Sequence, residues 1–127
     1  MNIIPFAYLF AFLALITVLF QFALAAGMPW GNLAMGGRYP GKFPPGMRVG
    51  AVVQALLIAF LAMVVLSNAG VAFTWLASLS NTLIWVAVAI SVVSLLMNLI
   101  TPSKWERIVW APVALLMTIS SIVIAVF

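Results

Sequence analysis

The sequence predicts an all-α membrane protein with four transmembrane helices in a left-handed bundle and a Gly/Pro-rich cytoplasmic loop between the first two helices. Hydrophobic residues make up 68% of the 127-residue chain, only 5% of its residues are charged, and long apolar runs dominate it. A soluble domain carries about 25% charged residues. Because so few charges cannot cover a water-facing surface, we expect a single transmembrane domain over residues 1–127.

Four segments are long enough for a helix that crosses a hydrocarbon core of about 30 Å. They cover residues 3–26, 49–66, 76–100 and 108–127, and residues 27–48 form the long connection. The first segment is uncharged and no basic residue precedes it, which favours a retained helix over a cleaved signal peptide. Turn-forming residues at 67–70 and Pro102 separate the later segments.

The basic residues fall in only two of the three connections, and the connection around residues 67–70 has no charge. With four spans, both charged connections lie on the same side of the membrane. Short basic loops stay cytoplasmic, so we expect a multi-pass protein of a bacterial inner membrane with both termini outside. The net charge of +4 fits an anionic lipid surface, and we expect no nucleic-acid partner.

Each span carries a stripe of small or polar residues at alternating spacings of three and four. Small residues let helices approach closely in lipid, and this period is typical of left-handed bundles. The stripes are Ala7, Ala11, Ala14, Val18, Gln21, Ala25; Ala51, Ala55, Ile58, Ala62, Val65; Ala77, Ser80, Ile84, Ala87, Ser91, Ser94, Asn98; and Ala111, Ala114, Thr118, Ser121, Ala125.

Four amide side chains lie within the spans: Gln21, Gln54, Asn81 and Asn98. They could line a substrate path or form hydrogen bonds between helices. Because none of them is ionisable, we favour structural contacts between helices.

The connection 27–48 contains six glycines and four prolines with aromatic residues between them, which predicts a compact loop folded against the cytoplasmic mouth of the bundle. Gly36, Gly37 and Arg38, with Lys42 and Arg48 nearby, are candidates to contact an anion or a lipid headgroup. The loop could also act as a lid. We favour a third interpretation, in which it is a structural plug.

The loop pattern resembles that of small bacterial four-span membrane proteins of unknown function. The residues that carry the resemblance are Gly27, Pro29, Trp30, Gly31, the segment 36–41, Pro44, Pro45 and Arg48, with 98–107, Trp110 and Pro112 later in the chain. The resemblance implies a four-span fold and no activity. Small multidrug exporters would have a glutamate in the first span, and this chain has none.

Glu106 is the only carboxylate, because the chain contains no Asp. Ser103 and Glu106 have the spacing of a capping box, in which each side chain bonds to the other residue's N–H. Alternatively, Glu106 could pair with Arg48 across the two loops. We favour the cap, which requires no tertiary contact.

The missing residue types limit the chemistry. The chain contains no Cys and no His, so we expect no metal, no cofactor and no enzymatic activity. We expect a non-enzymatic structural, accessory or regulatory membrane component, with the bilayer and a membrane protein or a second copy as partners. The alternative is a small oligomeric transporter or channel for a neutral or anionic solute, with the pore between protomers and without proton coupling through a buried carboxylate.

Overall fold

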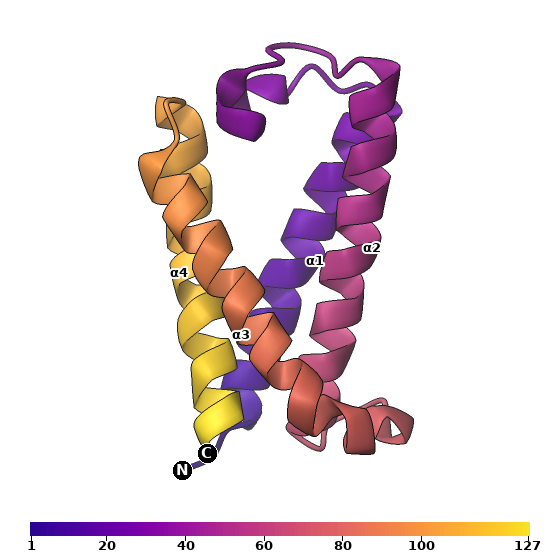
Figure 1. Cartoon of the computed structure of the whole chain (residues 1–127), viewed down its shortest axis with the longest axis vertical. Coiled ribbons are helices and arrows are strands. Elements are labelled where there is room, and N and C mark those ends of the chain that lie inside the picture. The colour runs from indigo at the N-terminus through magenta and orange to yellow at the C-terminus, as the bar shows by residue number, and fades with distance from the viewer.

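A computed structural model describes all 127 residues as four long helices without strands. The helices are α1 (Ile4–Ala26), α2 (Pro45–Asn68), α3 (Ala77–Ile100) and α4 (Lys104–Val126), and each is long and apolar enough to cross a membrane. The chain is therefore a four-helix membrane bundle. Both termini lie at one end, and the long loop lies at the other (Figure 1).

Two helices begin earlier than the predicted spans. Pro45 occupies the first turn of α2, where the lack of an N–H and a fixed φ favour a helix start. Ser103 caps α4, and its Oγ accepts from the Glu106 N–H at 3.3 Å. The loop consequently ends at Pro44, and it contains two short 3₁₀ helices, Gly31–Leu33 and Met35–Gly37.

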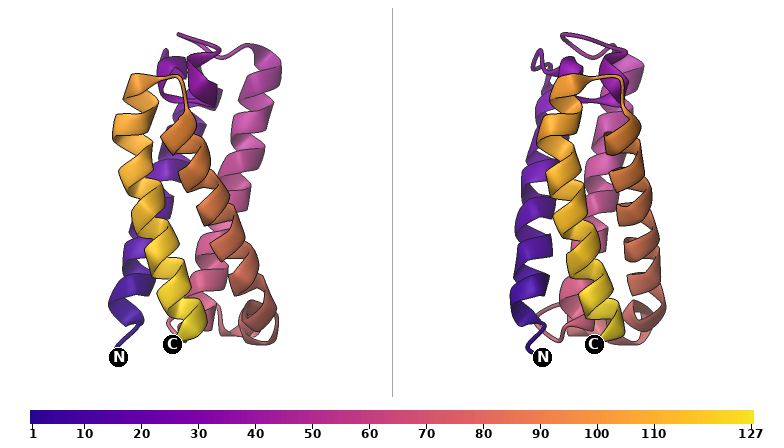
Figure 2. Two further views of the ribbon diagram at one scale, coloured as in Figure 1. Left: turned by 60° about the vertical axis from the view of Figure 1, so that its left-hand side comes forward. Right: turned by 90° about the vertical axis from the view of Figure 1, so that its left-hand side faces the viewer.

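The four helices pack most tightly in the half of the bundle that contains the termini. Ala7, Phe10, Ile84 and Ala87 are almost completely buried there, in one cluster with residues of α2 and with Ile124. Toward the loop end, the pair α1–α2 diverges from the pair α3–α4 (Figures 1 and 2).

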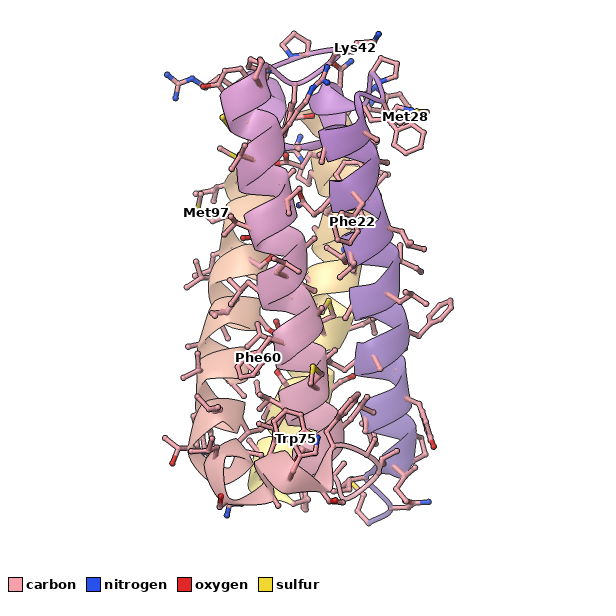
Figure 3. The ribbon with its side chains drawn as sticks, turned by 90° about the vertical axis from the view of Figure 1, so that its right-hand side faces the viewer. Phe22, Met28, Lys42, Phe60, Trp75 and Met97 are labelled. Atoms are coloured by element: carbon pink, nitrogen blue, oxygen red, sulfur yellow. The ribbon has the colours of Figure 1, made fainter.

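The small-residue stripes face the interior of the bundle, as predicted. Every stripe residue is buried or half-buried except Ala77, which is exposed at the start of α3. Large apolar residues cover the outside, where Phe60 and Met97 project from α2 and α3 (Figure 3). Trp75 is 71% exposed at the end opposite the loop, a position typical of an aromatic anchor at the membrane interface.

A polar contact links three helices near the termini. Asn68, the last residue of α2, donates from Nδ2 to the carbonyl of Ile124 on α4 at 3.5 Å. The Ser80 hydroxyl on α3 donates to Asn68 Oδ1 at 3.1 Å. The sequence pattern had marked Asn68 only as a turn residue, but the structure makes it a junction between helices.

Replacing Ala87 with Leu should destabilise the bundle by about 1–3 kcal/mol, because Ala87 is fully buried in the tight half and the added atoms must force helices apart. Ala114→Leu is the matched control, because Ala114 lines an open cavity that can accept the larger side chain. Thermal unfolding in mild detergent measures both variants. Equal losses of stability would contradict the difference in packing between the two halves.

Candidate functional site: an intramembrane cavity under a docked loop

The diverging helices enclose a cavity of about 1110 Å³ at the loop end. All four helices line it, and the loop contributes Ala34, Gly36, Arg38 and Phe43. The cavity ends where Phe10, Ile58 and Leu61 meet, at the edge of the tightly packed half. Four short spans were expected to leave room for a pore only between protomers, but the structure has a cavity inside a single chain.

The loop lies across the end of the bundle and docks on the turn between α3 and α4. The Ser103 hydroxyl donates to the carbonyl of Asn32 at 2.6 Å. A Cβ on Gly36 would lie 3.3 Å from Cδ of Pro102, so glycine allows the two backbones to approach. The loop therefore connects the α1–α2 pair to the α3–α4 pair at the end where they diverge (Figure 1).

Glu106 makes a second long-range contact of this docking, across 70 positions of the sequence. Its carboxylate Oε2 accepts from the Gly36 N–H at 3.1 Å, and the side chain is only 7% exposed. The N-cap predicted for Ser103 is confirmed, but its reciprocal half is wrong. Glu106 bonds to the loop, and the Ser103 N–H donates to Thr101 Oγ1 at 3.2 Å.

The alternative partner of Glu106, Arg48, lies elsewhere. Arg48 donates from Nε to the carbonyl of Phe43 at 2.9 Å. Its guanidinium packs over Gly27, where a Cβ would lie 3.4 Å from Nη2. Arg48 therefore ties the start of α2 to the loop and to the end of α1.

The turn at Gly36, Gly37 and Arg38 uses its three N–H groups within the chain. Gly36 donates to Glu106, Gly37 donates to the carbonyl of Ala34, and Arg38 donates to the carbonyl of Met35. Backbone donors of this turn are therefore occupied by the chain's own acceptors. The exposed side chains of Arg38 and Lys42 are the cationic groups of the loop, and the Arg38 guanidinium lies over the Tyr39 ring, 6.0 Å from its centroid.

Gly31 allows the loop to fold back on itself. Its N–H donates to the carbonyl of Gly41 at 2.9 Å, and a Cβ at this position would lie 1.8 Å from the carbonyl oxygen of Tyr39. Phe43 is 4% exposed and packs with Leu24 and Ala51 at the ends of α1 and α2. The loop is thus anchored by burial as well as by hydrogen bonds.

Polar side chains line the middle of the cavity. Thr17 and Asn98 donate to carbonyl groups of their own helices, at 2.8 and 2.7 Å. The side chains of Gln21, Gln54 and Ser91 also line it and have no hydrogen-bond partner in the chain. Unpaired amides are costly in a membrane, so these groups favour a bound polar molecule or water.

The amide side chains that were predicted to form hydrogen bonds between helices form none in the structure. Asn98 also contacts Ser94 Oγ at 3.3 Å, which is a contact within α3. Gln21 and Gln54 face the cavity, and Asn81 is exposed on the outside of α3. The interhelical contact among amides comes from Asn68 instead.

An aromatic group closes one side of the cavity. Phe20 on α1 packs against Trp110 on α4 with ring centroids 4.7 Å apart and a tilt of 53°. Trp30 of the loop lies parallel to Phe20 at 6.4 Å. These contacts join α1, α4 and the loop on this side of the cavity.

No family model, no curated protein and no solved structure matches the chain. The resemblance to small bacterial membrane proteins therefore stays a prediction, and the function has to be argued from the cavity.

Removing the Glu106 carboxylate should release the loop. We expect Glu106→Ala to cost about 1.5–3 kcal/mol, the range for a hydrogen bond to a charged group, and Glu106→Gln to cost less because its amide oxygen can still accept from Gly36. Trypsin digestion in detergent measures the release, because Arg38 and Lys42 are cleavage sites in the loop. Equal cleavage rates in Glu106→Ala and the unchanged protein would contradict the docking role.

Proposed function

We propose that the protein is a non-enzymatic membrane component that holds a small molecule in the cavity beneath its loop. The observation that carries the proposal is a volume of about 1110 Å³ that contains unpaired polar side chains inside a membrane-spanning bundle. Ligand cavities in proteins typically have about 300–1,000 Å³ and combine apolar walls with a few polar groups. The cavity has this combination, and its volume is slightly above this size range.

The lining supports binding rather than catalysis. Its only acidic group is Glu106, which is engaged by Gly36, and the chain has neither His nor Cys to activate a nucleophile. The groups that remain are amides, hydroxyls and Arg38, which can orient a ligand by hydrogen bonds and charge. An accessory or regulatory role that depends on the bound molecule fits this set.

Transport of a neutral or anionic solute is the second candidate. It is favoured by the one-sided shape of the cavity, which opens near the loop and is closed by the tight packing of the other half. A transporter would need a second conformation in which that half opens. The small residues in its core could allow the helices to shift.

We further propose that the loop end is cytoplasmic, in a bacterial inner membrane, with both termini outside. All five basic side chains belong to the loop, the start of α2 or the start of α4, which lie at one end of the bundle (Figure 1). Short segments rich in Lys and Arg are retained on the cytoplasmic side. The bilayer is then one partner, and a second copy or another membrane protein can cover the exposed apolar faces.

Reporter fusions should test this orientation. An alkaline phosphatase fused after Phe127 should be active, because the enzyme folds only outside the cytoplasm, and a fusion within residues 41–46 should be inactive. The opposite pattern of activities would contradict the charge-based orientation.

Filling the mouth of the cavity should remove the bound molecule. A Cβ at Gly50 meets no atom within 4 Å, so Gly50→Phe can place its ring at the cavity, which Gly50 lines. Native mass spectrometry of protein extracted from its membrane should find a bound molecule in the unchanged protein and not in this variant. Gly46→Phe is the matched control, because Gly46 also has open space and does not line the cavity. Identical spectra for all three proteins would exclude the binding role.

A further inference from the structure

We infer that the ligand of this cavity is an anionic membrane lipid, which enters sideways between α2 and α3 and places its headgroup beneath the loop. The inference rests on the proposed binding function and adds the chemical class of the ligand and its path of entry. Three features carry it: the position of the mouth, the order of polar and apolar groups along the cavity, and the charge of the loop end.

The mouth can be located from the cavity residues that remain exposed. On α2 they are Gly50 and Gln54, on α3 they are Val93, Met97 and Ile100, and at the loop end they are Met35, Arg38 and Pro102. No cavity residue of α1 or α4 is exposed, because those helices form the back wall with Phe20 and Trp110. The opening therefore runs between the two membrane spans α2 and α3, where it faces the acyl chains of the bilayer, and it continues to the loop end.

The α3 side of this mouth is apolar, and a group of polar side chains lies in the middle of the otherwise mostly apolar cavity. Val93, Met97 and Ile100 are 58–74% exposed, and Met97 projects outward from α3 (Figure 3). Gln21 and Ser91 lie inside, about 8–14 Å from the loop end of their helices at 1.5 Å per residue, and Gln54 lies at the mouth on α2. An amphiphile matches this order, with its polar part among the amides and its chains leaving through the mouth.

The charge at the loop end selects an anion. Arg38 lines the cavity and is exposed, and Lys42 lies at the same end of the molecule (Figure 3). The only carboxylate is buried and bonded to Gly36, so no exposed acidic side chain competes with a ligand for these cations. A phosphate group can accept from the Arg38 guanidinium and from the amide N–H groups of the glutamines.

A lipid is favoured over a soluble anion by the direction of the opening. Soluble anions are absent from the hydrocarbon region that faces Val93 and Met97, whereas a lipid of the adjacent leaflet already has its chains there. Lipid acyl chains can also fill an apolar mouth that opens into the membrane, and doing so exposes no apolar surface to water. The unpaired amides then gain partners from the headgroup and the ester groups.

Thermal stability in detergent with added phosphatidylglycerol or phosphatidylcholine tests the inference. The unchanged protein should bind phosphatidylglycerol about fivefold more tightly, and Arg38→Gln should remove this preference, because one basic group near an anionic lipid contributes about a fivefold change in affinity. Lys104→Gln is the matched control, since it removes the same charge at the loop end from a residue that does not line the cavity. Gly50→Phe should lose the effect of both lipids.

A second measurement uses the unchanged cavity in case Gly50→Phe does not fold. The chain has no Cys, so a fluorophore on Ser94→Cys reports from the cavity and one on Leu116→Cys reports from the outside of α4. Brominated phosphatidylglycerol should quench the Ser94 label more strongly than brominated phosphatidylcholine does, and the two lipids should quench the Leu116 label equally.

The outcomes separate the inference from the proposed function. If a bound molecule is found and disappears in Gly50→Phe, but the two lipids act equally on stability and on the Ser94 label, the cavity binds something else and the inference is overturned alone. If no bound molecule is found and neither lipid acts through the cavity, both the inference and the binding function fail. A preference for phosphatidylglycerol that Lys104→Gln removes and Arg38→Gln does not would place the lipid on the outer surface and also overturn the inference.

Discussion

The hydrogen bond between the Glu106 carboxylate and the Gly36 N–H is the contact on which the loop end of the molecule depends. It joins residues 70 positions apart, and it uses the only acidic side chain of the chain. At this end α1 and α2 diverge from α3 and α4, and the packing of Phe20 against Trp110 connects the two pairs on one side of the cavity only. The loop makes the remaining connection. On the α3–α4 side it contacts Ser103 through a hydrogen bond and Pro102 through close packing. Together with the burial of Phe43, these contacts hold the loop over the cavity.

The wedge shape follows from where small residues meet. Near the termini, Ala7, Ala14 and Ala87 are less than 2% exposed, so the backbones approach closely and exclude everything else. Toward the loop the stripes continue as Gln21 on α1 and as Ser94 and Asn98 on α3, whose side chains are larger or polar. Polar groups in lipid need partners, and helices that cannot supply them to each other leave space for another molecule. The same stripes therefore produce a sealed half and an open half.

Much of the fold could be predicted from the sequence because its signals are local or periodic. Span length, the turn at 67–70, the Ser103 cap and the inward faces of the stripes all depend on residues within one or two helical turns. The cavity could not be predicted, because it depends on the angle between the helix pairs. Sequence periodicity shows which face of a helix is buried, but it does not show the angle at which helices cross. The partner of Glu106 was missed for a related reason. A capping box is satisfied within four residues, and no local pattern indicates that a glycine 70 positions earlier offers a better-placed N–H. Asn68 and Asn81 show the same limit, since their spacing does not reveal which one reaches a neighbouring helix.

The internal use of Glu106 also determines how the molecule presents charge. A surface carboxylate beside five basic residues would neutralise part of their field, but this carboxylate is buried and directed at a backbone amide. Arg48 is likewise engaged through its Nε with the Phe43 carbonyl, and Arg107 donates to the carbonyl of Thr101. Hydrogen bonds within the loop end therefore engage its only acidic side chain, Glu106, and two of its basic side chains. Arg38 lies at the edge of the cavity, where no carboxylate neutralises its charge. Since unpaired amides next to hydrocarbon are costly and no carboxylate neutralises Arg38, one molecule that carries an anionic head on apolar chains can bind to both at once.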